Sequence, residues 1–296
     1  MSFDARHLPL LRELGDLKRI RSAGRAGTIA ERLFRRGWAA LARGEAADGV
    51  MRRTVAAALA AARLGDLDRD KLGQLGLSDA EALVVLTRGF DEVAAVVEPA
   101  LAADLRGVLA AGAPGGDAVP AFVDLLGEQP RAGVTCPGRP RLLLQPAESH
   151  AEHCLMVAVY GVLAAPGYGA DPVSVFVASM AHHLHNVSMP DAGFTGEVLL
   201  GDLLDRVIGD ARERALSELS PAVQALVRDA LKPIGGEGTP EARAFHVGDV
   251  LDRVLEIEQH ARASVDMAVV LGDYELVHAG PVKAFHDRVL GEVGLL

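Results

Sequence analysis

The amino-acid sequence predicts an almost entirely α-helical protein. Half of its 296 residues are hydrophobic but only 4% are aromatic, so the core has to be built mainly from alanine, leucine and valine. Alanine and leucine are good helix formers, and a core of this kind suits closely packed helices. Isoleucine, threonine and tyrosine, which strands favour, are scarce. We therefore expect helices throughout and, at this length, one large domain or about two ordinary ones.

Helix signals recur through the first part of the chain. Thr28 is followed three residues later by Glu31 and then by apolar residues at helical spacing, which predicts an N-cap and a helix over Thr28–Ala42. The run Ser78-Asp79-Ala80-Glu81 is a capping-box pattern that opens a long helix, and Pro99 either kinks that helix or begins another. The other expectations for this part are a helix over Met51–Leu64 that ends at Gly65 and a linker over Ala111–Asp117.

Four prolines interrupt the middle of the chain, within Pro130–Pro146. Proline lacks a backbone N–H group and clashes with the preceding turn, so a segment with prolines at this density cannot be a helix. We expect an extended crossing there. The sequence thus divides into an N-terminal helical region (1–130), a Pro-rich crossing (131–147) and a second helical part (148–296).

The second part is expected to begin with a helix from Ala147 or Glu148 to Ala164, stopped by Pro166-Gly167. Asp171-Pro172 supplies an N-cap with proline at the first helical position, which predicts a helix over Val173–Leu184. A loop is expected over Ser188–Gly193, with further helices over Gly196–Ile208, Pro221–Leu231, Pro240–Arg262, Val265–His278 and Pro281–Val293.

The charge of the chain is acidic overall and uneven along its length. A net charge of −10 disfavours a dedicated nucleic-acid binder, because phosphate contacts need a basic surface. Residues 1–63 carry one lysine and twelve arginines against six acids, a balance of +7, which leaves −17 for the remainder. We interpret this asymmetry as docking of the basic first part on the acidic second part; a surface for a partner and an arm for an anionic substrate are the alternatives.

Nothing in the sequence indicates export or a membrane span. Charged residues interrupt the first seventeen positions, where a signal peptide needs an apolar run. No apolar stretch reaches about 18 residues without a charge or a Gly/Pro break. Cys136 and Cys154 are too few for a disulfide framework, so we expect a reduced, cytoplasmic compartment. The sequence does not decide between a monomer and a homo-oligomer.

Histidines and carboxylates gather at three places in the second part, on three separate predicted helices. These are Glu148–His153, the run His182-His183-Leu184-His185-Asn186, and Phe245–Asp252. Imidazole and carboxylate groups from separate helices are how a helical protein builds a metal site. Each place also contains a pair spaced three residues apart, which puts both members on one helix face. The pairs are His150 with His153, His182 with His185, and Asp249 with Asp252.

These segments resemble the motifs of the HD-domain superfamily, particularly its deoxynucleotide 5′-phosphatase branch. Pro146–Cys154 is similar to the P-E-S-x-A-E-H-S opening of that branch. Met180–His183 lies where the superfamily has its L-L-H-D doublet, and Val247–Asp252 resembles the closing A-D-x-L-D helix. The resemblance covers roughly Gln145–Leu290 and implies an HD-like helical bundle with a metal site. By this resemblance the metal ligands are His153, His182, His183 and Asp249.

Two positions depart from the family pattern. The aspartate of the doublet is His183 here, and an imidazole does not bridge two ions as a carboxylate does. In the phosphatase branch a glutamate that positions water follows the doublet by three residues, and Asn186 stands at that place. We therefore expect one divalent transition metal, Zn, Fe, Mn, Co or Ni, rather than Mg, because nitrogen donors are softer than oxygen donors.

The two helix faces that carry a His-x-x-His pair allow a second possible set of metal ligands. This set is His150, His153, His182 and His185, with Asp249 or Glu152. In the family-derived set, Asp249 is expected to supply negative charge and to accept a proton from water. His185 or Glu152 would orient the ligands. Arg139 and Arg141, which precede the first motif, are expected to contact phosphate.

The first hypothesis for function is a metal-dependent hydrolase of a phosphorylated small molecule, nucleotide-like in kind, that uses a single ion held by histidine and aspartate. The alternative is a degenerate HD module that binds metal and acts as a sensor or scaffold without turnover. The changes at His183 and Asn186 motivate that alternative. Oxidative chemistry, found in some HD-fold iron oxygenases, is disfavoured because it relies on the bridging aspartate that His183 replaces.

Overall fold

The computed structural model describes residues 4–116, 118–262, 283–284, 287 and 290. The chain forms two compact units, Met1–Glu256 and Ile257–Leu296. The helices expected over Val265–His278 and Pro281–Val293 lie outside the described residues, apart from four positions of the second. All further statements about structure concern the described residues.

The all-α prediction is confirmed for the part of the chain that is described. No β-strand occurs there, and extended pairing is limited to two isolated bridges, Pro130 with Ser149 and Val134 with Leu142. Both bridges involve the Pro-rich segment, which is extended and non-helical as expected. The α-helices are α1 (Leu8–Gly15), α2 (Ile29–Ala42), α3 (Ala47–Leu64), α4 (Arg69–Gln74), α5 (Asp79–Ala94), α6 (Pro99–Gly107), α7 (Ala121–Glu128), α8 (His150–Tyr168), α9 (Pro172–Ala181), α10 (Gly193–Leu200), α11 (Leu204–Leu216), α12 (Pro221–Leu231) and α13 (Pro240–Arg262).

Capping contacts confirm several predicted helix starts, although the helix expected from Met51 begins at Ala47, without a side-chain cap. The Oγ1 atom of Thr28 accepts the backbone N–H of Glu31 at the start of α2. Ser78 and Glu81 form a reciprocal capping box at the start of α5. Pro99 begins a new helix, α6, rather than kinking α5. Side chains that accept these otherwise unpaired N–H groups fix where each helix begins.

Three predicted helix ends were wrong. Helix α8 runs through Pro166 to Tyr168 and is ended by Gly169, which adopts a left-handed conformation (φ 67°); the buried packing of α8 outweighs the single hydrogen bond that proline removes. Helix α9 ends at Ala181, three residues early. The helix expected over Gly196–Ile208 is split, because Gly201 takes a positive φ of 50° between α10 and α11.

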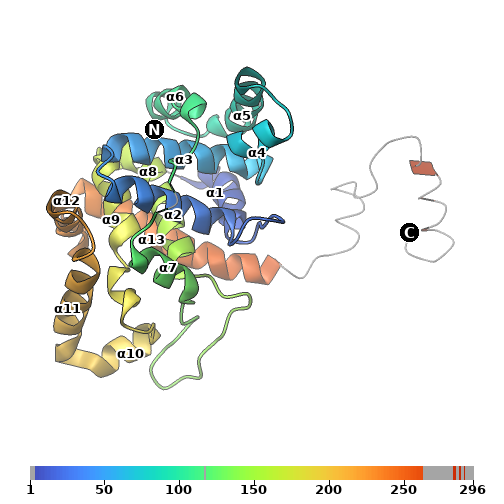
Figure 1. Ribbon diagram of the computed structural model, residues 1–296. Helices are drawn as coiled ribbons and strands as arrows, with labels where there is room; N and C mark the ends of the chain where they lie inside the picture. Colours follow the sequence, from blue (N-terminus) through green and yellow to red (C-terminus); the bar gives the residue numbers. More distant parts are fainter. Residues whose placement is uncertain (1–3, 117, 263–282, 285–286, 288–289, 291–296) are drawn as a thin grey trace. The chain divides into compact units, whose positions relative to one another are not determined.

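Helix α8 lies at the centre of the first unit. All sixteen residues from His150 to Ala165 are buried, and the helix packs against α9, α2 and α7. In Figure 1, α4, α5 and α6 lie at one end of this unit and α10 and α11 at the other. One hydrophobic cluster joins residues from both sides of the Pro-rich segment, so the N-terminal helices and α8 share a core. The division into domains at 131–147 stays a prediction.

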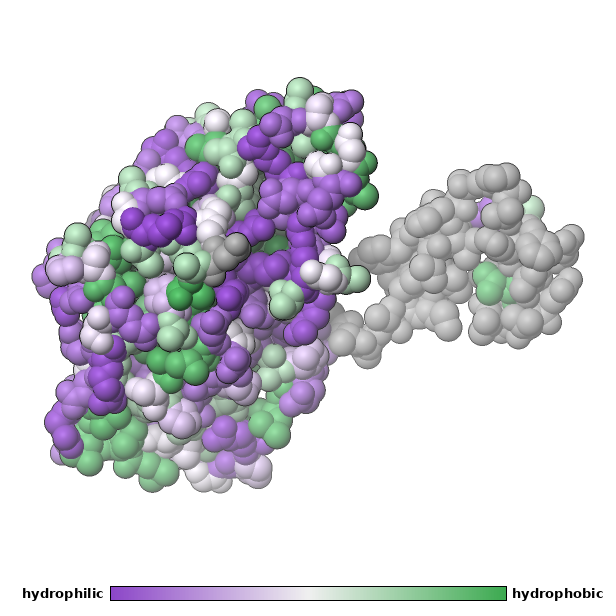
Figure 2. Space-filling view, in the orientation of Figure 1, coloured by the Kyte–Doolittle hydropathy of each residue, from purple (hydrophilic) through white to green (hydrophobic). Residues whose placement is uncertain are grey.

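The lower end of the first unit is apolar and exposed. Helix α10 has no buried residue, and Leu199 is 82% exposed. Figure 2 shows hydrophobic atoms gathered at the lower left of this face, near α10 and α11 of Figure 1. No helix among the described residues is both long and apolar enough to cross a bilayer.

Two glycines allow α8 and α13 to approach closely. A Cβ atom on Gly248 of α13 would lie 2.6 Å from the carbonyl oxygen of Val157 and 3.0 Å from the backbone nitrogen of Gly161, both in α8. Contacts this short with backbone atoms cannot be relieved by a side-chain rotation. The separation of the two helices therefore depends on the absence of a side chain at Gly248.

Gly248→Ala is expected to destabilise the protein by about 1–3 kcal/mol, because the added methyl group forces α13 away from α8. The matched control is Gly209→Ala in the middle of α11, where an added Cβ meets nothing within 4 Å. That change should leave stability unchanged or raise it by up to about 1 kcal/mol, since alanine is the better helix former. Urea denaturation measures both, and equal effects at the two positions would contradict the close-approach argument.

Candidate metal centre

The start of α8 places the first histidine of the site. The Ser149 Oγ atom accepts the backbone N–H of Glu152 at 3.2 Å, and a Glu152 carboxylate oxygen accepts the N–H of Ser149 at 2.7 Å. This capping box begins the helix at His150. His153 then follows on the first turn, fully buried in the core.

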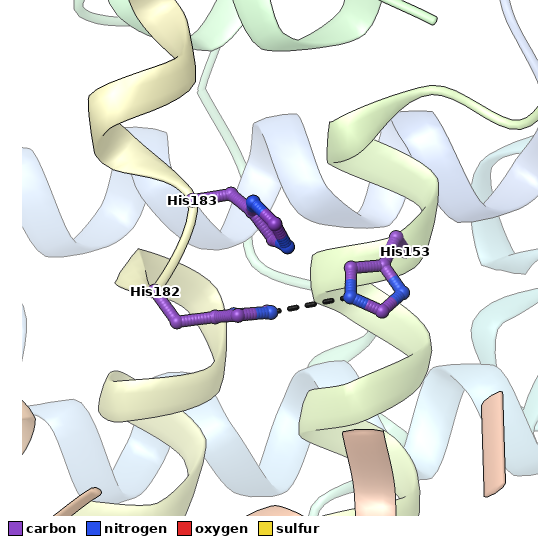
Figure 3. Close-up of side chains that lie close together, drawn as sticks. All are labelled: His153, His182 and His183. Carbon is purple, nitrogen blue, oxygen red and sulfur yellow. Dashed lines mark hydrogen bonds between the residues drawn. The ribbon is translucent and has the colours of Figure 1, made fainter. Parts of the chain in front are cut away.

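The end of α9 places the other two histidines. His182 is the C-cap of α9, and His183 leaves the helical conformation (φ −99°, ψ 15°) before a short 3-10 turn over Leu184–Val187. Neighbouring residues of a regular helix point about 100° apart. Because the helix ends between them, both rings face His153, each with a centroid 5.1 Å from its ring. Figure 3 shows the three rings, from two neighbouring segments, pointing toward one region.

Each of the three imidazoles is anchored through its Nδ1 atom to a hydrogen-bond acceptor. An acceptor at Nδ1 holds the proton there and leaves Nε2 with its lone pair free to bind a cation. This is the arrangement found around histidines that bind metals, whose second nitrogen donates to a carboxylate or a carbonyl group. The acceptors are Asp252 Oδ2 for His153 at 2.7 Å, the Ser179 carbonyl oxygen for His182 at 2.6 Å and Asn186 Oδ1 for His183 at 2.7 Å.

The orientation of the Asn186 amide is itself fixed. Its Nδ2 atom donates to the carbonyl oxygen of Met189 at 3.1 Å, so its Oδ1 atom is the one that faces His183. Asn186 is buried. The residue that departs from the family pattern therefore orients a neighbouring ring.

The free nitrogen atoms converge at distances that suit a metal ion. The Nε2 atoms of His153 and His182 lie 3.2 Å apart, and Asp249 Oδ1 lies 3.4 Å from His153 Nε2. Ligands at 2.0–2.1 Å from a tetrahedral zinc ion lie about 3.3–3.4 Å from one another. Ligand atoms of His153, His182 and His183 all fall within 4.8 Å of one another. Two lone pairs at 3.2 Å repel, so either a proton or a cation has to lie between them, and the residues present fit a cation.

The surroundings of the site favour neutral His182 and His183 and an ionised Asp249. Burial lowers the pKa of His182 and of His183 well below the usual value, and neighbouring imidazoles and Arg131 add to this effect. Burial also opposes the charged form of His153, but the carboxylates of Asp249 and Asp252 outweigh it and raise its pKa. Burial would raise the pKa of Asp249, yet the contact with His153 lowers it well below its usual range. The ligating forms of His182, His183 and Asp249 thus prevail at neutral pH.

Three of the four predicted ligands, His153, His182 and His183, have ligand atoms close to one another, and the fourth, Asp249, lies within 3.4 Å of His153 alone. Glu152 lies elsewhere. Glu152 uses its carboxylate to cap α8 and to accept the hydroxyl of Thr28 at 2.7 Å, not to orient an imidazole. The ring of His185 lies 5.5 Å from that of His183, and its buried Nδ1 atom has no hydrogen-bond partner among the described residues. Burial, reinforced by Arg212, lowers the pKa of His185 to about 4.

The second ligand set does not converge in the same way. His150 is fully buried, with its ring 4.6 Å from that of His183 and its Nε2 atom 3.6 Å from Asp191 Oδ2. Neither His150 nor His185 joins the group of ligand atoms around His153. Burial followed by the charge of Arg131 lowers the pKa of His150 to about 3, so it stays neutral.

The two arginines expected to contact phosphate stay a prediction, and the structure shows only their protein surroundings. Arg139 is exposed, and Arg141 donates to the carbonyl oxygens of Ala132 and Ala192, which ties the extended segment together. The arginine beside the imidazoles is Arg131, whose charge lowers the pKa of the neighbouring histidines. Its Nη1 atom is buried and has no hydrogen-bond partner among the described residues.

Sequence reasoning missed three residues that support the site. These residues are Asp252, Lys18 and Asn186. The sequence contained a signal for Asp252 in its i, i+3 pairing with Asp249, and for Lys18 in its being the single lysine among the first 63 residues. Lys18 Nζ lies 2.9 Å from Asp252 Oδ1. Nothing local to Asn186 predicts its bond to His183, because that bond depends on where α9 ends.

No protein-family model, curated protein or solved structure matches this chain. The resemblance to the HD-domain superfamily therefore rests on the three motifs and stays a prediction.

His182→Ala is expected to abolish metal binding, because it removes one of the converging Nε2 atoms. Protein purified without chelators should carry one equivalent of transition metal by elemental analysis, and the variant none. His246→Ala is the matched control: His246 Nε2 lies 3.1 Å from the Gly236 carbonyl oxygen, its ring lies against Phe245, and it belongs to neither group of close ligand atoms. Equal metal content in the parent and His182→Ala would rule out the centre.

Asn186→Ala is expected to weaken metal affinity about 10- to 100-fold, because the His183 ring loses the acceptor that fixes its tautomer. Gln129→Ala is the control: its Nε2 atom also donates to the Met189 carbonyl oxygen, at 3.2 Å, but it has no hydrogen bond to His183. Competition with a chromogenic chelator measures both affinities. A loss of the same size in Gln129→Ala would assign the effect to the Met189 turn instead.

Proposed function

We propose that this chain is a metal-dependent phosphohydrolase of the HD type that acts on a phosphorylated, nucleotide-like small molecule. A single divalent transition-metal ion would be held by the Nε2 atoms of His153, His182 and His183 and by the carboxylate of Asp249. The observation that carries the proposal is that ligand atoms of His153, His182 and His183 lie within 4.8 Å of one another. The Nδ1 atom of each ring is already hydrogen-bonded to another group of the protein, which leaves Nε2 to bind the ion. When bound, such an ion supplies Lewis-acid activation of water and of a phosphoryl oxygen.

The protein's own residues divide the remaining work. Asp249 has a pKa well below the usual range through its contact with His153, which keeps it charged and makes it a better ligand than proton acceptor. His185 is neutral at pH 7, and its buried Nδ1 atom has no hydrogen-bond partner among the described residues, so it can accept a hydrogen bond from water; its pKa of about 4 makes it a weak proton acceptor at neutral pH. Glu152 stays at the cap of α8 and takes no part in proton transfer.

Arg131 supports an anionic substrate. Its Nε atom lies 3.6 Å from Glu148 Oε1, which leaves the buried Nη1 atom as a free donor beside the imidazoles. A guanidinium with an unused donor in a partly buried site is well suited to bind a phosphoryl oxygen. Its charge also disfavours protonation of the histidines, so the same residue keeps the imidazoles ready to ligate.

A metal-binding sensor without turnover is the second candidate. Asn186 replaces the carboxylate that positions water in the resembling branch, and its side chain is fully used by His183 and Met189. Such a module would bind metal and a phosphorylated ligand but release no phosphate.

Arg131→Gln is expected to lower kcat/KM for phosphate esters by about 10- to 200-fold, the range of a lost charge-assisted hydrogen bond, without changing the metal content. Protein loaded with Zn, Mn, Co or Fe is assayed against nucleoside monophosphates and other phosphate monoesters. Arg139→Ala, an exposed arginine of the same segment, should behave like the parent.

Two results would contradict the proposal. Absence of phosphate release by the parent with every metal would exclude the hydrolase, and nucleotide binding under those conditions would favour the sensor. Equal kcat/KM for Arg131→Gln and the parent would exclude Arg131 from substrate binding.

A further inference from the structure

Lys18 is a buried lysine whose ammonium group lies among three carboxylates. It comes from the short 3-10 turn Asp16–Lys18 that follows α1, and it is 3% exposed. One carboxylate belongs to Glu148, two residues before α8, and two belong to α13; each is almost fully buried. The Lys18 Nζ distances are 2.8 Å to Glu148 Oε2, 2.9 Å to Asp252 Oδ1 and 2.8 Å to Glu256 Oε2.

The carboxylate cage formed by Glu148, Asp252 and Glu256 is next to the candidate metal centre. Ligand atoms of Glu148, His153 and Asp252 lie within 4.8 Å of one another, which makes them a second group able to hold an ion. His153 stands between the two places: its Nε2 atom faces His182, and its Nδ1 atom faces Asp252. One imidazole thus separates a nitrogen-rich position from an oxygen-rich one.

The Lys18 ammonium group already supplies a positive charge at the oxygen-rich position. The negative charges of the three carboxylates are compensated by three cations: Lys18 at the centre of the cage, Arg19 beside Glu256 and Arg131 near Glu148. Burial alone would lower the pKa of Lys18, but the carboxylates raise it well above its usual value, so the ammonium stays charged. A buried charge is tolerated where it is paired in this way, and removal of one partner leaves the others uncompensated.

We propose that the Lys18 ammonium is a built-in cation that occupies the place a second metal ion would take, and so limits the centre to one ion. Lys18 is then a residue that determines metal stoichiometry, supplied from outside the segments that carry the histidine motifs. The inference goes beyond the proposed phosphohydrolase, because it concerns the carboxylate cage rather than the imidazoles.

The two positions can be counted separately because their donors differ. Oxygen donors suit Ca²⁺, and imidazole nitrogen donors suit Zn²⁺. If Lys18 only joined the N-terminal turn to α13, its removal would weaken the fold and create no new affinity for a divalent ion. If it replaces an ion, its removal opens a site that Ca²⁺ can fill.

The experiment compares Lys18→Ala and Lys18→Gln with Lys18→Arg, which keeps a cation in the cage. Each full-length protein is loaded with Zn²⁺, and bound Ca²⁺ is counted by equilibrium dialysis. We expect one additional equivalent of Ca²⁺ in Lys18→Ala and in Lys18→Gln, and none in the parent or Lys18→Arg. Ca²⁺ should also raise the Tm of the first two proteins alone. Adding Asp252→Asn to Lys18→Ala should remove the additional equivalent and so locate it.

Each outcome decides the inference. Equal Ca²⁺ content in the parent and in both neutral variants overturns it, as does failure of both variants to fold with and without Ca²⁺, since an ion that replaces the ammonium must restore the cage. Absence of Zn²⁺ from the parent would exclude the proposed phosphohydrolase centre. The difference in Ca²⁺ count would still decide the role of Lys18.

Discussion

The orientation of one buried imidazole, His153, governs the candidate centre. Its Nδ1–H group donates to Asp252, whose other oxygen is held by Lys18, so the ring cannot turn without breaking a buried ion pair. Burial opposes the charged form of Asp252, but the charge of Lys18 and the hydrogen bond with His153 outweigh it and lower the pKa of Asp252 to about 2, which keeps that acceptor charged. A charged acceptor at Nδ1 directs the lone pair of Nε2 toward His182 and Asp249. The other ligands can converge only because this ring is fixed.

The N-terminal helices belong to the site physically. Thr28 caps α2, and its hydroxyl group donates a hydrogen bond to Glu152. Glu152, the residue before His153, also accepts the backbone N–H of Ser149 in the capping box of α8. Lys18 reaches α8 and α13 from the turn after α1. The N-terminal helices are therefore coupled to α8 and α13 through buried polar contacts, which contribute most when every partner is satisfied. Removal of the N-terminal region would leave buried carboxylates without donors.

The sequence predicted the parts of this arrangement that depend on local chemistry. The all-α class, the caps at Thr28 and Ser78 and the extended Pro-rich segment follow from residue types and short-range spacing, and the structure contains them. The end of α9 at Ala181 was not predicted, because no glycine or proline lies between Ala181 and the expected end at Leu184 to mark it. The expected docking of the basic residues 1–63 on the acidic remainder is present in the described structure. Lys18 and Arg19 pair with Glu148 and Glu256, and arginines such as Arg25 pair with acids just beyond residue 63, such as Asp66.

Two independent features bear on how many ions the centre can hold. His183 has an imidazole, which does not bridge two ions, at the position where the HD-domain motif it resembles has an aspartate, and its Nδ1 atom lies 2.7 Å from Asn186 Oδ1. Lys18 fills the neighbouring carboxylate cage with a fixed positive charge. With His183 alone, the carboxylate cage could still hold a second ion; with Lys18 alone, a bridging carboxylate could still be shared by two ions. With both residues present, no bridging oxygen is available at position 183 and the cage is already filled by the ammonium group. A lysine ammonium cannot activate water as a metal ion does. The ammonium in place of a divalent ion and the neutral His183 in place of an aspartate would together keep the net charge of a two-ion site. Lewis-acid chemistry would then be confined to the face formed by the imidazoles.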